Sequence, residues 1–118
     1  LAIITGRSSR VVEHRARNLG IEIVHQGAHD KLVVYEALCR ELNIDCAATA
    51  YMGDDVVDLP VMRRAGLAIT VPAAPELVKA YSHYTTTREA GHGAVREACE
   101  FLMRAQGTLD AALAPYLK

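Results

Sequence analysis

The fold of this chain is decided by the stretch Tyr51-Met52-Gly53-Asp54-Asp55-Val56-Val57-Asp58-Leu59-Pro60. The apolar run at 48–52 predicts a short buried strand, and residues 59–65 predict a short helix. The Gly-Asp-Asp turn between them then lies at the carboxyl end of a strand, the edge of an open parallel sheet where ligands bind. The stretch therefore predicts an α/β fold with a binding site at this turn.

The three carboxylates of this stretch predict a metal site. Asp54, Asp55 and Asp58 fall within five positions, where they repel one another unless a cation or hydrogen-bond donors neutralise them. Mg²⁺ is the cation that suits hard oxygen ligands of this kind, because it binds through one or two protein carboxylates plus waters and phosphate oxygens. An alternative remains open, in which the turn is merely polar and Asp58 caps the following helix.

The rest of the chain alternates strand and helix patterns. We expect strands near 1–4, 22–25, 48–52, 67–71 and 83–86, and helices near 10–19, 30–43, 59–65 and 94–105. A further short helix begins at Pro75, and the tail at 108–118 is compatible with a helix. Pro75 is placed at the first helical position of its helix. This alternation predicts right-handed crossovers and a doubly wound, Rossmann-like parallel sheet in a single domain over residues 1–118.

Composition excludes several classes of partner. The chain has 118 residues, a formal net charge of −1 and 51% hydrophobic residues, so it has a core and gives no electrostatic case for nucleic acid or anionic membrane. No apolar run approaches the roughly 20 residues of a membrane span. Cys39, Cys46 and Cys99 follow no zinc-like or CxxC spacing, and we interpret them as reduced core thiols of a cytoplasmic protein.

Three chemical groups are expected to meet at one edge of this sheet. Thr5 and Gly6 follow the first strand, Lys31 follows the second, and Asp54 follows the third. A hydroxyl, an ammonium and a metal-binding carboxylate together make a phosphoryl-binding set. A lysine in the first turn of a helix opposes the helix dipole, so Lys31 is explained if an anion shares its position. The alternative is a solvated lysine at the edge of its helix.

The order of these motifs resembles motifs II, III and IV of the haloacid dehalogenase (HAD) superfamily of phosphatases. Ile4-Thr5-Gly6-Arg7, Asp30-Lys31, Ala50-Tyr51-Met52-Gly53-Asp54-Asp55 and Gly93-Ala94-Val95-Arg96-Glu97 are similar to one branch, the capless 3-deoxy-D-manno-octulosonate 8-phosphate (KDO 8-phosphate) phosphatases. The likeness covers nearly the whole chain. It implies an Mg²⁺-dependent homotetramer acting on a sugar-acid phosphate in lipopolysaccharide precursor synthesis, with each active site covered by a neighbouring subunit.

The resemblance also implies roles for individual residues. Asp54 corresponds to the metal-ligand carboxylate, with Asp55 and Asp58 supporting the metal site. Thr5 corresponds to the phosphate-binding hydroxyl and Lys31 to the cation of motif III. The remaining substrate-binding positions are Gly6, Arg7 and Arg15. The guanidinium groups of the two arginines suit a substrate carboxylate or sugar hydroxyls.

One part of the family chemistry is missing from the sequence. HAD phosphatases use an Asp nucleophile and a second Asp two residues later as general acid and base, and no Asp-x-Asp occurs here. We therefore expect this chain to be the carboxyl-terminal part of an enzyme whose nucleophile strand lies upstream and fills the middle of the sheet. On this hypothesis the complete protein is active, whereas residues 1–118 alone neither hydrolyse phosphate esters nor melt cooperatively.

Two other functions remain open from the sequence. One is a related HAD-like domain of the sialic-acid or nonulosonate pathway, as a 9-phosphate phosphatase or fused to a cytidylyltransferase. The other is a non-catalytic module that binds a metal or a phosphosugar. Neither GxGxxG nor GxxxxGK[ST] occurs in the chain, so dinucleotide and P-loop binding are unsupported.

Overall fold

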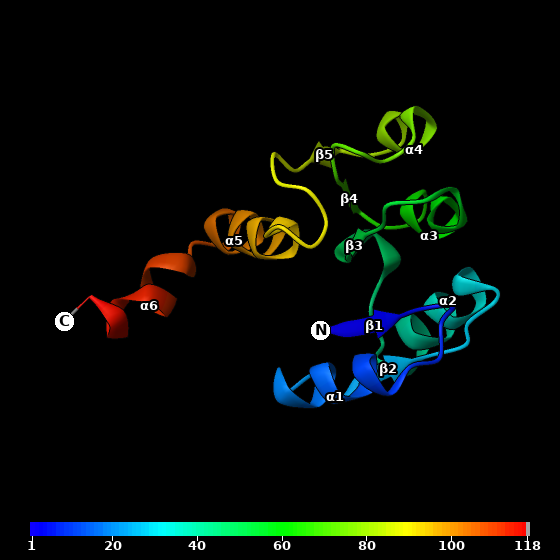
Figure 1. The fold of residues 1–118 in the computed structure, drawn as a ribbon, viewed down its shortest axis with the longest axis horizontal. Helices are drawn as coiled ribbons and strands as arrows, with labels where there is room; N and C mark the ends of the chain where they lie inside the picture. Colours follow the sequence, from blue (N-terminus) through cyan, green and yellow to red (C-terminus); the bar gives the residue numbers. More distant parts are fainter. Residues whose placement is uncertain (118) are drawn as a thin grey trace.

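The computed structural model describes residues 1–117 and shows alternating strands and helices (Figure 1). The elements, in chain order, are β1 (Ala2–Ile4), α1 (Arg10–Asn18), β2 (Ile23–His25), α2 (Lys31–Glu41), η1 (Cys46–Ala48), β3 (Ala50–Met52), η2 (Val56–Asp58), α3 (Leu59–Met62), β4 (Leu67–Thr70), α4 (Glu76–Ala80), β5 (Tyr84–Thr85), α5 (Ala94–Gln106), α6 (Leu109–Leu113) and η3 (Ala114–Tyr116). The tail at 108–118 is helical as far as it is described, and Lys118 lies outside the described residues.

The strands are parallel, as predicted, but they form two separate sheets. β1 pairs with β2, and β3, β4 and β5 form a second sheet in that order. Within residues 1–117 no strand pairing joins the two sheets, and Figure 1 shows them on either side of a gap between β1 and β3. This division agrees with the expected order, in which these two groups of strands flank a further strand.

Side-chain packing holds the two sheets together. Tyr35 and Cys39 of α2 form a buried cluster with Val61 of α3, and Ile4 of β1 and Tyr51 of β3 pack against it. This cluster therefore connects elements from both sheets. It also fixes α2 beside α3, which brings the amino end of α2 close to the end of η2.

A larger core lies under the three-stranded sheet. Its buried members come from α3, β4, the turn after β4, α4 and α5, and they are Met62, Ala68, Val71, Ala74, Val78 and Ala94. Burial of apolar surface here stabilises the fold by about 25 cal/mol per Å². The sheet β3-β4-β5 is thus a rigid base for the acidic turn that follows β3.

Three local predictions were wrong. The sequence places Val11, Val12, Ala16 and Leu19 on one apolar side of α1, but only Ala16 is buried, and Val11 and Leu19 are 76% and 58% exposed. The strand predicted at 83–86 is assigned only to Tyr84–Thr85, although the amides of His83 and Thr86 still donate to carbonyls of β4. Pro75 lies one residue before its helix and not within it.

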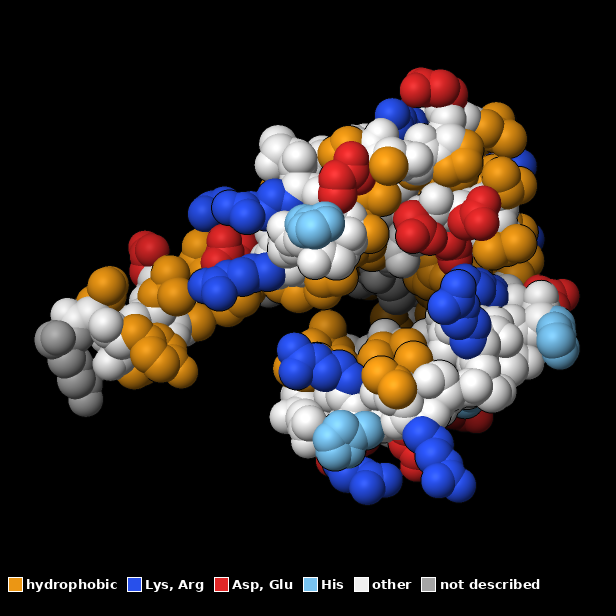
Figure 2. Space-filling view, viewed as in Figure 1, with side chains coloured by type: hydrophobic (Ala, Val, Ile, Leu, Met, Phe, Trp, Pro, Cys, Tyr) orange, Lys and Arg blue, Asp and Glu red, His pale blue; other side chains and the backbone are white. Residues whose placement is uncertain are grey.

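Helix α5 is attached to β5 through one carboxylate. Glu97 accepts hydrogen bonds from the Tyr84 hydroxyl at 2.6 Å and from the backbone amides of Thr87 and Arg88. The Tyr84 ring also stacks on Phe101 at a centroid distance of 4.4 Å. Beyond α5, the segment from α6 to η3 projects away from the body of the molecule (Figures 1 and 2). None of the helices described for residues 1–117 has the length and apolar character of a membrane span.

Candidate functional site

A pocket of about 250 Å³ lies at the carboxyl ends of the strands, where the two sheets meet. It is lined by residues from β1, α2, the turn after β3 and the start of α5, among them Ile4, Lys31, Gly53, Asp54, Asp58 and Ala94. Acidic side chains gather next to basic ones in this part of the surface (Figure 2). The structure therefore brings Lys31 and Asp54 to one rim, as predicted from strand order.

Asp58 is the most fully bonded side chain of the site. It is 3% exposed, and its Oδ1 accepts hydrogen bonds from Lys31 Nζ at 2.7 Å and from the Tyr51 hydroxyl at 2.8 Å. Its Oδ2 accepts hydrogen bonds from the backbone amides of Asp54 at 3.1 Å and Asp55 at 3.2 Å. Burial acts to raise the pKa of the Asp58 carboxyl, but the hydrogen bonds from Lys31 and Tyr51 outweigh it and keep this pKa below its ordinary value. Asp58 is therefore an anion at neutral pH.

The turn after β3 is shaped around this carboxylate. Asp55 accepts a hydrogen bond from the Val56 amide and forms a capping box with Asp58, which begins the 3-10 helix η2. The alternative that Asp58 caps the following helix is wrong in its detail, because its side chain makes no cap hydrogen bond to α3 and bonds to the preceding amides. Gly53 is required here, since a Cβ at this position would lie 2.5 Å from Asp58 Cβ.

The position of Lys31 is explained by its ion pair with Asp58. Asp30 caps α2 by accepting a hydrogen bond from the Val33 amide, which places Lys31 in the first turn. Its side chain is only 17% exposed, so the alternative of a solvated lysine is wrong. The anion that offsets the helix dipole at this position is supplied by the protein itself. The Nζ group carries three N–H donors and gives one of them to Asp58, so others remain for a ligand in the pocket.

Tyr51 is a site residue that the sequence analysis missed. Burial, followed by the negative charge of Asp58, raises the pKa of the Tyr51 hydroxyl, which keeps it protonated and able to donate to that carboxylate. One signal for this role was present in the sequence. Side chains alternate along a strand, so a tyrosine two residues before the glycine of the turn points to the same face as that turn.

Asp54 has the properties of a single protein ligand for a cation. It lines the pocket, its side chain is exposed, and within residues 1–117 its carboxylate oxygens accept no hydrogen bond and form no ion pair. The described chain contains no group of three His, Cys, Asp or Glu side chains placed to hold a metal. One free carboxylate beside a phosphate-binding cation nevertheless fits Mg²⁺, which takes its remaining ligands from water and phosphate oxygens.

Thr5, Gly6 and Arg7 form the loop that follows β1, next to this pocket. The loop is fixed by hydrogen bonds from the Ala28 amide to the Thr5 carbonyl at 2.9 Å and from the Gly27 amide to the Arg7 carbonyl at 3.0 Å. The Thr5 hydroxyl oxygen accepts a hydrogen bond from the Arg7 amide at 3.2 Å, which leaves its proton for another acceptor. Ile4 lines the pocket, whereas Thr5 lies one residue beyond the lining.

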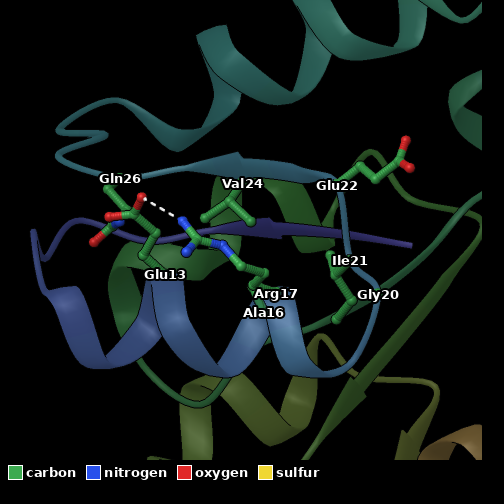
Figure 3. A pocket seen from close by; sticks show the side chains of 8 residues that line it. All are labelled: Glu13, Ala16, Arg17, Gly20, Ile21, Glu22, Val24 and Gln26. Carbon is green, nitrogen blue, oxygen red and sulfur yellow. Dashed lines mark hydrogen bonds and ion pairs between the residues drawn. The ribbon is translucent and has the colours of Figure 1, made fainter.

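Arg15 lies on the exposed surface of α1 and does not line the pocket. Its predicted contact with substrate therefore stays a prediction, and within one copy of residues 1–117 the structure does not bring it to the site. A second pocket, of about 680 Å³, lies between this helix and β2 (Figure 3). The ion pair between its lining residues Arg17 and Glu13 measures 3.4 Å, and the side chains are 75% and 58% exposed, so solvent weakens this pair.

Comparison with known proteins gives a family match for most of the chain. Residues 12–98 match the model of the haloacid dehalogenase-like hydrolases. Over 112 residues the chain is 44% identical to 3-deoxy-D-manno-octulosonate 8-phosphate phosphatase KdsC of Yersinia pestis. This alignment covers 95% of the chain and 60% of the relative, so the chain spans less than two thirds of the relative's length.

Solved structures give the same result. A probable YrbI family phosphatase from Pseudomonas syringae is 48% identical with a TM-score of 0.96, covering 99% of this chain and 66% of that one. The 3-deoxy-D-manno-octulosonate 8-phosphate phosphatase of Moraxella catarrhalis, solved with magnesium, phosphate and KDO, is 47% identical with a TM-score of 0.95. That match covers 98% of this chain and 67% of the other. The arrangement of the two sheets is therefore that of longer phosphatases.

Proposed function

Because the chain belongs to the haloacid dehalogenase-like hydrolase family, we propose that its protein hydrolyses a sugar-acid phosphate, namely KDO 8-phosphate, to KDO and phosphate. The observation that carries this proposal is the Lys31–Asp58 ion pair of 2.7 Å at the rim of the strand-end pocket, beside the free carboxylate of Asp54. The names of the most similar relatives support the substrate.

Each group of the site has a role in this proposal. Lys31 donates to a non-bridging phosphate oxygen while Asp58 holds its side chain in place, and the Thr5 hydroxyl and the Gly6 amide donate to other oxygens. Asp54 holds Mg²⁺, with Asp55 near it on the same turn. The bound Mg²⁺ supplies positive charge that offsets the charge on the phosphoryl oxygens.

The reaction also needs a nucleophile. Asp58 is committed to four donors and Asp54 is assigned to the metal, so neither is available to form an aspartyl phosphate. The proposal therefore takes the nucleophile from a segment of the full-length protein outside residues 1–118, which supply the phosphate- and metal-binding groups. In the same proposal, Arg7 and Arg15 bind the carboxylate and hydroxyl groups of the substrate. The protein is a homotetramer, and Arg15 acts across a subunit interface. It works in the cytoplasm, in lipopolysaccharide precursor synthesis.

Phosphate release from KDO 8-phosphate by the full-length protein tests this function. We expect turnover with Mg²⁺ that is lost with a chelator, and Asp54→Asn lowers kcat about 100-fold or more because a metal ligand contributes several kcal/mol to the transition state. Asp110→Asn, on the exposed surface of α6, is the matched control and retains activity.

The outcomes separate the alternatives. Full activity of Asp54→Asn contradicts the metal assignment. If a nine-carbon sugar-acid 9-phosphate is hydrolysed faster than KDO 8-phosphate, the substrate belongs to the nonulosonate pathway. Mg²⁺ binding without any turnover in the full-length protein refutes the enzyme and favours a binding module.

A further inference from the structure

Two cysteines that are seven positions apart in the chain lie together at the end of α2 opposite Lys31. Cys39 is in the last turns of α2 and Cys46 is the first residue of η1. Both contact the same buried cluster, in which Tyr35 and Val61 are the neighbours of Cys39 and Cys46 packs against them. The pair is separate from the strand-end pocket and has no part in the proposed phosphatase chemistry.

The connection between α2 and η1 folds back so that both cysteines reach the same buried cluster. Asn43 has a φ of 53°, in the left-handed region, and the Ile44 amide donates to the Cys39 carbonyl at 2.9 Å. Asp45 then caps η1 by accepting a hydrogen bond from the Ala47 amide at 3.0 Å. These bonds fix the connection that carries Cys46 back towards the cluster containing Cys39.

Cys39 and Cys46 share one buried cluster and line one surface pocket. Burial first, and then a hydrogen bond with the Cys46 thiol, raise the pKa of the Cys39 thiol. Cys39 is 8% exposed and is therefore the less reactive of the two, whereas Cys46 is only partly buried. Both line a surface pocket of about 520 Å³ with Glu36, Arg40 and Asp45, which gives a small oxidant access.

We propose that Cys39 and Cys46 form a reversible disulfide when the protein meets a peroxide. The Cys46 sulfur attacks the peroxide O–O bond, which breaks to leave a sulfenic acid on Cys46 and one water. The Cys39 sulfur then attacks the Cys46 sulfur, its thiol proton leaves with the hydroxyl group, and a second water is released. Two thiols lose two electrons in total, and one hydrogen peroxide is reduced to two waters.

The bridge connects elements that carry the site at their opposite ends. Lys31 begins α2, and Asp54 follows the strand that η1 leads into. A covalent bond between the far ends of these elements restricts the unfolded chain and stabilises the folded one, while leaving the pocket itself unchanged. The disulfide thus stabilises the folded protein under oxidising conditions.

Peptide mapping of the full-length protein tests this proposal directly. Trypsin cleaves after Arg40, so the two cysteines fall in separate peptides, 32–40 and 41–63. After treatment with hydrogen peroxide and alkylation of free thiols, we expect these two peptides to remain linked, lighter by two hydrogens, and to separate on reduction. We also expect the thermal midpoint to rise by a few degrees and to return on reduction.

Matched variants make the result decisive. Cys99→Ser retains the linked peptides, whereas Cys46→Ser and Cys39→Ala lose both the link and the rise in thermal midpoint. A folded protein in which peroxide produces only sulfinic acid at Cys46, or joins Cys46 to Cys99, overturns the proposal. None of these readouts depends on phosphatase activity, so failure here is distinguishable from failure of the proposed function.

Discussion

Replacing Asp58 with Asn tests the central interaction of the site. The substitution keeps the shape of the side chain but removes the charge that pairs with Lys31, whose own side chain is 17% exposed. Removing one partner of a buried ion pair costs about 3–5 kcal/mol. The carboxamide also cannot accept all four hydrogen bonds that reach the carboxylate. We expect a loss of about 4 kcal/mol in the free energy of unfolding at neutral pH.

Urea denaturation of the full-length protein measures this loss, and a double-mutant cycle isolates the ion pair. Lys31→Met leaves the Asp58 carboxylate with three of its donors, so we expect a smaller cost than for Asp58→Asn. The double variant removes both charges and should be more stable than the sum of the two single losses implies, by about 1–3 kcal/mol. A cost below about 1 kcal/mol for Asp58→Asn, or additive losses, refutes the reasoning.

The effect of Asp58→Asn also depends on pH. Because the pKa of Asp58 is lowered in the folded protein, its contribution to stability is fully present above the ordinary carboxyl pKa. It is lost as the pH falls below that value towards the folded pKa. The difference between the native protein and Asp58→Asn should therefore be constant near neutrality and shrink in acid, while Asp110→Asn changes the free energy of unfolding by less than about 0.5 kcal/mol.

Three further substitutions test contacts that stabilise the fold. Hydrogen bonds from Tyr84, Thr87 and Arg88 lower the pKa of Glu97 to about 2, so Glu97→Gln lowers the thermal midpoint at neutral pH. This difference between the two proteins disappears as the pH falls from 4.5, the ordinary pKa of the Glu97 carboxyl, towards 2. Thr70→Val raises the free energy of unfolding by about 1 kcal/mol in chemical denaturation, because the buried Thr70 hydroxyl has no hydrogen-bond partner among the described residues. Gly66→Ala lowers it by about 3 kcal/mol, because a Cβ there would lie 1.9 Å from the carbonyl oxygen of Ala47.

Each of these has its own control. A midpoint difference for Glu97→Gln that persists unchanged at pH 2 contradicts the role of its charge. A loss of stability in Thr70→Val shows that the hydroxyl is bonded after all. Gly107→Ala meets no atom within 4 Å and carries only the strain of a φ of 73°, so it should cost about 1 kcal/mol. If it costs as much as Gly66→Ala, the clash is not the cause.

Local signals in the sequence were enough to place most elements. Ser9 and Asp30 are common N-cap residue types and cap α1 and α2, and Gly20 has a positive φ just after the end of α1. The order of apolar runs predicted parallel strands, and the strand ends predicted that Lys31 and Asp54 would share a pocket. These features depend on contacts over a few residues or on the general rules of crossovers.

Contacts between distant segments could not be predicted from the sequence. The ion pair between Lys31 and Asp58 joins residues 27 positions apart, and nothing in the pattern distinguished Asp58 as its partner from Asp54 and Asp55. The exposure of Val11 was not predicted, for a related reason. An apolar residue on a helix indicates which side of the helix tends to be buried, but it does not indicate whether another element covers that side. Both failures concern packing between elements, which periodicity does not specify.

The Lys31–Asp58 pair also spans the junction of the two sheets. Lys31 begins the helix that follows β2, whereas Asp58 belongs to the turn after β3, so one ion pair links the two halves of the molecule. An anion that binds the remaining N–H donors of Lys31 interacts with the same charge that forms this ion pair. Ligand affinity and the stability of this junction are therefore thermodynamically coupled, and amide hydrogen exchange at Thr5 and Gly53 should respond in step when phosphate is added.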